Sequence, residues 1–176
     1  MEEESVILVD HKDNEIGLMP KTEAHKKAML HRAISVFIFN SKREWLLQRR
    51  AITKYHSGGL WTNTCCSHPL PNETNIDAVN RRLQQEMGMQ CSLKEIFSFT
   101  YKEALDNELT EYEFDHVFIG ISDFIPIINV TEVALFKYVK YNDLTLDLKN
   151  NPSDYTVWFK KIFERMQSYC VNYKTE

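Results

Sequence analysis

Apolar residues recur every three or four positions in two segments of the chain, residues 74–87 and 154–173. This spacing places them on one face of an amphipathic helix. Thr74 or Asn75 is suited to cap the first helix, and Gly88 is suited to end it. The apolar positions are Ile76, Val79, Leu83 and Met87 in the first helix and Trp158, Ile162, Met166 and Tyr169 in the second.

Other apolar segments are short and rich in β-branched and aromatic residues, which predicts strands. A turn at Asp13-Asn14 joins the first two strands into a hairpin, and Thr22 is suited to cap a short helix through Ala28. The predicted strands are 5–9, 15–19, 32–40, 45–49, 93–102, 112–123 and 130–141. This order predicts an α/β (α+β) fold, a mixed sheet flanked by helices. Without an internal repeat or linker, we expect one compact domain over residues 1–176.

The composition is that of an ordinary globular protein, with 43% hydrophobic and 26% charged residues. A net charge of −4 without a polybasic block argues against nucleic acid as a partner. The acidic segment Met1-Glu2-Glu3-Glu4 does not resemble a signal peptide, and the apolar run 117–128 falls short of the ~20 residues of a membrane span. Four cysteines show no secreted disulfide pattern. We therefore expect a cytoplasmic protein with free thiols and no membrane span, either a monomer or a weak homodimer.

Candidate chemistry begins with the segment Trp61–Pro69, which reads Trp-Thr-Asn-Thr-Cys-Cys-Ser-His-Pro. If this segment is extended, Cys66 and His68 leave the same face. Glu111 and Glu113 repeat this spacing within a predicted strand. A pocket that contains all four side chains is suited to hold a metal ion, to transfer protons, or both. Simple burial is the alternative for Cys66, because cysteine is among the most buried residue types.

Histidines add to this candidate pocket. His25 and His31 flank the point where the predicted short helix gives way to a strand, and a break there lets both reach a common ion. Glu111 and Glu113 repel each other on one strand face unless a cation lies between them. With His68 these residues form a ligand set for Mn²⁺, Zn²⁺ or Mg²⁺; solvated histidines and an edge strand lined with carboxylates are the alternatives. The remaining histidines, His11, His56 and His116, are expected to be solvated and without function.

Cationic residues indicate a possible anion site. Arg82 lies one helical turn before Glu86, so the two could form an ordinary ion pair. Alternatively, Arg82 faces an anion and Glu86 holds Mg²⁺ at phosphate oxygens. Arg49, Arg50 and Lys54 follow a predicted strand and could complete an anion-binding rim, with surface solvation as the alternative for each.

Together these motifs resemble the type I isopentenyl-diphosphate isomerases, a family with the Nudix fold. The resemblance covers nearly the whole chain and is most specific in Trp61–Pro69; Ser57-Gly58-Gly59 departs from the family's usual Pro-Gly. It implies isomerisation of isopentenyl diphosphate to dimethylallyl diphosphate through a tertiary carbocation. A Nudix hydrolase of a nucleoside diphosphate derivative is the alternative, but hydrolases carry glutamates where this chain has Arg82 and Gln85. A binding module whose metal serves only for folding is a third possibility.

The resemblance also implies a role for each candidate residue. Cys66 and Glu113 would be the proton-transfer pair. Glu86 and the backbone carbonyl of Cys66 would hold Mg²⁺ on the diphosphate. A second divalent ion, Mn²⁺, Zn²⁺ or Mg²⁺, would be bound by His25, His31, His68, Glu111 and Glu113. The phosphates would be held by Lys21, Arg50, Lys54 and Arg82, and the hydrocarbon end would be lined by Tyr101 and Trp158, whose ring could stabilise the cation.

Overall fold

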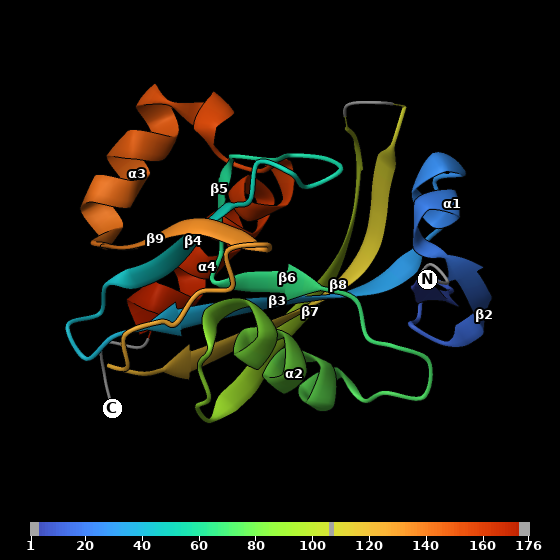
Figure 1. The fold of residues 1–176 in the computed structure, drawn as a ribbon, viewed down its shortest axis with the longest axis horizontal. Helices are drawn as coiled ribbons and strands as arrows, with labels where there is room; N and C mark the ends of the chain where they lie inside the picture. Colours follow the sequence, from blue (N-terminus) through green and yellow to red (C-terminus); the bar gives the residue numbers. More distant parts are fainter. Residues whose placement is uncertain (1–3, 106–107, 173–176) are drawn as a thin grey trace.

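A computed structural model describes residues 4–105 and 108–172, with side chains up to residue 166. The strands are β1 Ser5–Val9, β2 Glu15–Pro20, β3 His31–Phe39, β4 Trp45–Arg50, β5 Trp61–Thr62, β6 Cys65–Ser67, β7 Leu93–Ala104, β8 Thr110–Ile121 and β9 Val133–Val139. The helices are α1 Lys21–Lys26, α2 Asn75–Met87, α3 Tyr141–Asn150 and α4 Val157–Asn172, with a 3-10 turn at Pro152–Asp154. The strands form one mixed sheet between α2 on one face and α4 on the other, as expected (Figure 1).

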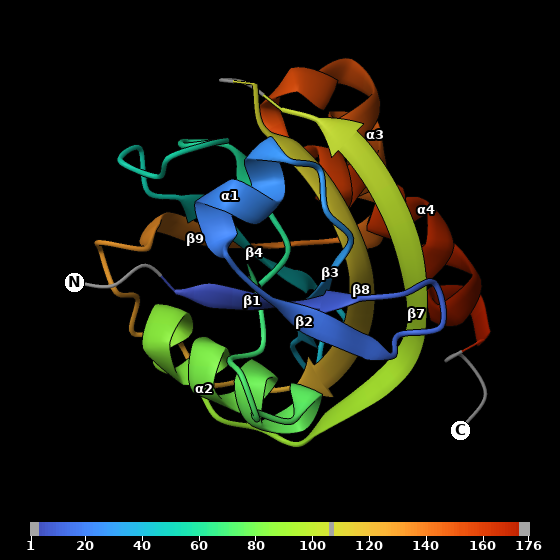
Figure 2. The same cartoon turned by 90° about the vertical axis from the view of Figure 1, so that its right-hand side faces the viewer.

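Strand β3 organises this sheet. It runs parallel to β8, from the pair His31–Glu113 to the pair Phe39–Ile121, and antiparallel to β1, β4 and β6. Strands β7 and β8 form a long antiparallel hairpin that curves along the sheet (Figure 2). The short strand β6 lies against β3 through the pair Ser35–Cys66. The topology therefore brings the Cys/His segment and the Glu111–Glu113 segment to the same central strand.

Apolar clusters on the two faces of the sheet hold the layers together. Val36 of β3 packs toward Val79 and Leu83 of α2, and each of these side chains is fully buried. The next residue of β3, Phe37, points to the other face and packs with Phe159 of α4. Because successive strand residues alternate between faces, a one-residue slip of β3 would exchange its side chains between the two clusters.

The helix predicted over 74–87 is confirmed. The Thr74 hydroxyl accepts a hydrogen bond from the Asp77 backbone N–H at 3.2 Å, and Gly88 ends the helix with a φ of 62°. The predicted C-terminal helix is present from Val157 onward. Its predicted residue Tyr173 and the side chain of Tyr169 lie outside the described part of the chain. None of the helices in the described ranges is long and apolar enough to cross a membrane.

Two details of the predicted elements are wrong. Thr22 does not cap α1 but lies inside it, after Pro20, which makes no side-chain cap hydrogen bond. The strand predicted to reach residue 141 ends at Val139, and α3 follows directly without having been predicted. Leu144 is the only buried residue of α3, and Tyr141 and Leu148 pack beside it against the cluster around α4.

Candidate functional site

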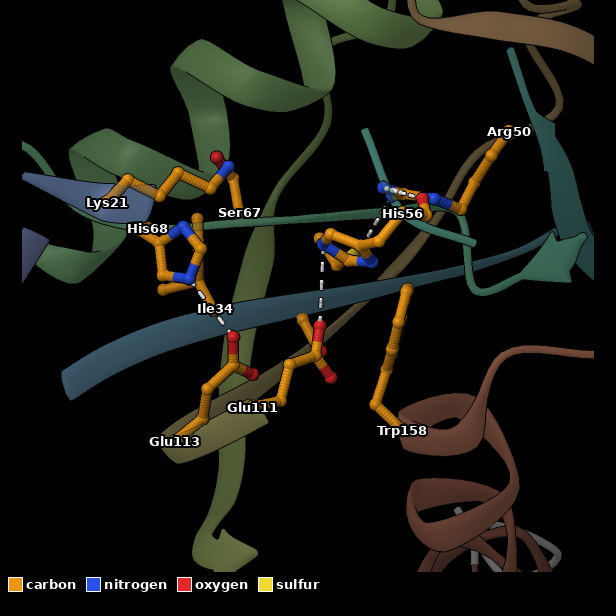
Figure 3. A pocket seen from close by; sticks show the side chains of 11 residues that line it. Lys21, Ile34, Arg50, His56, Ser67, His68, Glu111, Glu113 and Trp158 are labelled. Carbon is orange, nitrogen blue, oxygen red and sulfur yellow. Dashed lines mark hydrogen bonds and ion pairs between the residues drawn. The ribbon is translucent and has the colours of Figure 1, made fainter. Parts of the chain in front are cut away.

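A pocket opens where β3, β6 and β8 meet α4 and the loop after β4 (Figure 3). The space between its lining residues, counted together with the open solvent at its mouth, is about 360 Å³. Seven predicted site residues line it together, and His56 lines it without having been predicted. The seven are Lys21, Arg50, Cys66, His68, Glu111, Glu113 and Trp158.

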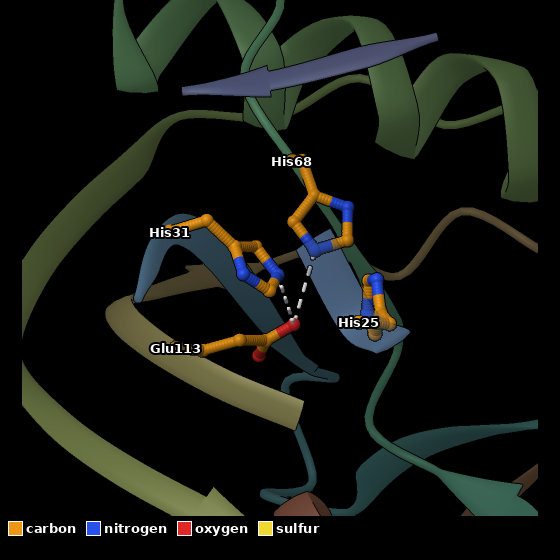
Figure 4. A group of neighbouring side chains, drawn as sticks. All are labelled: His25, His31, His68 and Glu113. Carbon is orange, nitrogen blue, oxygen red and sulfur yellow. Dashed lines mark hydrogen bonds and ion pairs between the residues drawn. The ribbon is translucent and has the colours of Figure 1, made fainter. Parts of the chain in front are cut away.

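Three histidines and one glutamate gather at one end of the pocket (Figure 4). His25 lies in the last turn of α1 and His31 begins β3, so the chain breaks between them as predicted. Their ring centroids lie 4.8 Å apart. The His68 ring lies 5.0 Å from that of His31. One potential ligand atom from each of His25, His31, His68 and Glu113 lies within 4.8 Å of the others.

The hydrogen bonds of these rings leave nitrogen lone pairs facing the cluster. Nδ1 of His25 lies 2.7 Å from the carbonyl oxygen of Lys21, and Nδ1 of His31 lies 2.8 Å from that of Met29. Each Nδ1 therefore donates a proton to a carbonyl, so each Nε2 carries the lone pair. Both Nε2 atoms are buried without a hydrogen-bond partner. Backbone carbonyls orient metal-binding histidines in this way, so the residues fit a divalent ion.

Protonation states in the cluster also suit a cation. Burial lowers the pKa of His25, and burial places the pKa of His68 well below its ordinary value. Burial alone would raise the pKa of Glu113, but the imidazoles of His31 and His68 outweigh it and lower this pKa. His68 Nε2 lies 3.0 Å from Glu113 Oε1. His25 and His68 are therefore neutral imidazoles near an ionised carboxylate.

Tyr101, which the resemblance assigned to the hydrocarbon end of the pocket, contacts both Glu111 and Glu113. Its hydroxyl oxygen is 2.9 Å from Glu111 Oε2 and 2.5 Å from Glu113 Oε2. A phenol donates only one proton, so the second contact needs a proton from a carboxyl group. Burial and the Glu113 charge raise the pKa of Glu111 well above its ordinary value. Glu111 is therefore the carboxyl group that keeps its proton in this arrangement.

Cys66 of β6 lines the same pocket. Burial raises the pKa of its thiol to about 12, although the Arg50 guanidinium opposes this shift. Arg50 Nη1 lies 4.0 Å from the sulfur. The side chain is therefore a protonated thiol at neutral pH, and it shares a cavity with Glu113.

The predicted phosphate-binding residues divide into two groups. Lys21 and Arg50 line the pocket, whereas Lys54 and Arg82 both form ion pairs with Glu132. Arg82 also forms an ion pair with Glu86 one helical turn away, so the ion pair considered from the sequence is present. Gln48, a residue the sequence did not single out, donates to the other Glu86 oxygen at 2.7 Å.

Two predicted metal ligands do not join the histidine clusters. Among the described residues, Glu86 and Cys66 belong to neither group of side chains placed to share an ion. Glu86 is buried, but both of its oxygens already accept hydrogen bonds from Gln48 and Arg82. A role for Glu86 or for the Cys66 carbonyl in holding Mg²⁺ stays a prediction from the resemblance.

The expectation that His56 and His116 are solvated is wrong, because their exposed fractions are 7% and 8%. His116 lies between the carboxylates of Asp13 and Glu95, at 3.0 and 2.6 Å. His56 lies in the pocket, and burial lowers its pKa to about 3. The one available signal in the sequence was its place two residues after Lys54, at the end of the cationic segment.

Comparison with known proteins identifies the family. The NUDIX domain family matches residues 29–159. A curated relative from Pectobacterium atrosepticum, named Isopentenyl-diphosphate Delta-isomerase, is 48% identical and aligns over 97% of this chain and 96% of its own. The chain belongs to the isopentenyl-diphosphate Delta-isomerase family of Nudix proteins.

A second member of the isopentenyl-diphosphate Delta-isomerase family, from Photorhabdus laumondii, is 53% identical over 91% of this chain and 90% of its own length. Among solved structures, a protein from Deinococcus radiodurans superposes with a TM-score of 0.70. It covers 84% of this chain and 90% of its own at 19% identity, which supports the Nudix fold alone.

Proposed function

We propose that the protein interconverts isopentenyl diphosphate and dimethylallyl diphosphate. The observation that carries this proposal is the shared cavity of the Cys66 thiol and the Glu113 carboxylate. Moving the double bond requires one proton added to a terminal carbon of the alkene and one removed from the carbon on the other side of the resulting cation. Because the reaction is reversible, each group acts as the acid in one direction and as the base in the other.

The protonation states in the pocket match this need for one donor and one acceptor. Burial keeps Cys66 protonated, and the neighbouring imidazoles keep Glu113 ionised. The Trp158 ring forms part of the wall, where its π face could stabilise a tertiary carbocation. Most of these side chains are buried, so few water molecules would be available to capture that cation.

A divalent ion would be held by His25, His31, His68 and Glu113, with Glu111 as a further ligand. Such an ion supplies a fixed positive charge that lowers the pKa of the carboxylates around it. Mn²⁺ or Zn²⁺ suits the imidazole ligands, and the same site would accept Mg²⁺ less strongly.

The diphosphate would lie near Lys21 and Arg50. Burial and the Arg50 charge lower the pKa of Lys21, so an anion between these two cations would relieve their repulsion. Lys54 and Arg82 would reach the phosphates by exchanging Glu132 for the substrate. Mg²⁺ brought with the diphosphate would be placed by Glu86, as the resemblance implies.

Helix α2 supports hydrolysis of the diphosphate less well than isomerisation. Diphosphate cleavage by the fold relies on several carboxylates that load metal ions, yet α2 offers Glu86 as its buried acidic residue. Arg82 pairs with Glu86 and so neutralises part of the charge that a metal cluster would need. The arrangement binds a phosphate more readily than it assembles a hydrolytic metal cluster.

The test is incubation of the protein with isopentenyl diphosphate, Mg²⁺ and Mn²⁺ in D₂O. Deuterium-labelled dimethylallyl diphosphate is the expected product. Release of phosphate without that isomer would instead establish a hydrolase. Cys66→Ala should lower turnover by at least ~10²-fold, because it removes a proton-transfer group. The matched control is Cys91→Ala, which removes a half-buried free thiol from another cluster and should behave like the parent protein.

A further inference from the structure

His56 forms a second candidate ligand group with His25 and Glu111. One potential ligand atom from each of the three residues lies within 4.8 Å of the others. His56 Nε2 is 3.8 Å from Glu111 Oε1, a contact drawn in Figure 3. The three side chains are all buried. The histidine is thus close to the carboxylate that the first ligand group leaves out.

The ring of His56 is held in one orientation. Its Nδ1 lies 3.2 Å from the Ser57 hydroxyl oxygen, and its backbone carbonyl accepts from Arg50 Nη2 at 3.4 Å. Tyr55 and Trp158 pack edge-to-face against it, with centroid distances of 4.3 and 5.8 Å. Nδ1 of His56 thus faces the Ser57 hydroxyl, and Nε2 faces the Glu111 carboxyl group.

The separation of 3.8 Å between His56 Nε2 and Glu111 Oε1 is too long for a hydrogen bond. It suits two ligands of one ion, since two atoms that are each ~2.1 Å from a metal lie about 3–4 Å apart. His25 has a single free nitrogen because its Nδ1 is bonded to the Lys21 carbonyl. The two ligand groups must therefore share one ion through His25 rather than hold two.

We propose that His56 is a fourth histidine of the metal centre and binds the shared ion through Nε2 together with His25 and Glu111. This inference rests on the proposed metal role of the same site. A fourth imidazole favours Zn²⁺, Co²⁺ and Mn²⁺ over Mg²⁺, because Mg²⁺ prefers oxygen ligands. His56 is then a residue that selects the metal, in addition to forming part of the pocket wall.

The experiment measures metal affinity rather than turnover. The metal-free protein is titrated with Co²⁺, Zn²⁺ and Mg²⁺ against a chromophoric chelator, and the Co²⁺ absorption spectrum is recorded. His56→Phe keeps a ring of similar size but has no lone pair, and His11→Phe at an exposed position is the control. We expect His56→Phe to weaken Co²⁺ and Zn²⁺ binding at least ~10-fold, to shift the Co²⁺ spectrum, and to change Mg²⁺ binding less than threefold.

A second variant, His56→Asn, covers the case in which phenylalanine disturbs folding, and circular dichroism checks both. Co²⁺ affinity within twofold of the parent and an unchanged spectrum in a folded variant would overturn the assignment of His56. His31→Ala separates this failure from that of the whole site. If His31→Ala also leaves affinity unchanged, the proposed metal centre itself is wrong; if it abolishes binding, only the fourth histidine is refuted.

Discussion

Replacing Tyr101 by phenylalanine tests the carboxylate pair directly. The change removes one oxygen that lies 2.9 Å from Glu111 and 2.5 Å from Glu113, and it leaves the ring in place. The two buried carboxyl groups then lose their common partner. A hydrogen bond to a charged group contributes about 1.5–3 kcal/mol. Because ~1.4 kcal/mol corresponds to a factor of ten in rate, we expect kcat/KM for isopentenyl diphosphate to fall about 10- to 150-fold.

The assay compares initial rates of dimethylallyl diphosphate formation at equal metal content. Tyr112→Phe is the matched control, because Tyr112 lies between the same two glutamates on β8 and points to the opposite face. Its ring lies 4.9 Å from the Lys102 ammonium group, outside the pocket. A loss of less than threefold for Tyr101→Phe, or equal losses in both variants, would refute the view that this hydroxyl organises the reacting carboxylates.

Three further outcomes are expected. Because burial raises the pKa of Cys66 to about 12, its alkylation by iodoacetamide, followed by mass spectrometry, should be slow at pH 8 and still rising at pH 10; a plateau below pH 9 contradicts this. The pKa of His56 falls from 6.5 to about 3 on folding, so the unfolded chain binds more protons within that window. The metal-free protein should therefore lose stability as pH falls from 6.5 toward 3, which is measured as a falling midpoint of urea unfolding. A midpoint that does not fall, or that falls equally in His56→Phe, contradicts this prediction. Glu132→Gln frees Lys54 and Arg82, so KM should drop about 3- to 10-fold; an unchanged or higher KM would show that Glu132 does not compete with the diphosphate.

The elements that the sequence predicted well are those in which several local signals agree. In α2 the spacing of apolar residues, the Thr74 cap and the left-handed Gly88 all indicate the same boundaries. The same holds for the pairs Cys66–His68 and Glu111–Glu113, because a spacing of two residues within or beside a strand fixes the face that they share. The structure brings these four side chains into one pocket, as the spacing predicted.

Helix α3 was missed because its local pattern contradicts its structure. Its leucines occur at every second position, as in a strand, and Leu146 is 59% exposed. The helix is held by contacts of Leu144 and Leu148 with the apolar cluster around α4. These contact residues are distant in the sequence, so a local pattern does not reveal them. Long-range packing therefore decides its conformation.

His56 was missed for a related reason. Its loop returns to β4, where the Arg50 N–H donates to the Leu60 carbonyl at 2.9 Å. A Cβ atom on Gly58 would lie 2.5 Å from the Ile52 carbonyl oxygen, so this return requires glycine. The sequence shows the glycine, but only the closed loop shows that the neighbouring imidazole turns inward.

The parallel pairing of β3 with β8 also bears on when the proposed metal site could form during folding. His31 stands opposite Glu113 in the first pair of this register, and β4, α2 and β7 all lie between the two strands in the chain. Contacts so distant in sequence form slowly, because a long loop must close first. The imidazoles of the proposed site therefore stay apart until the sheet is assembled. Metal uptake at the proposed site would then follow completion of the fold and would not nucleate it.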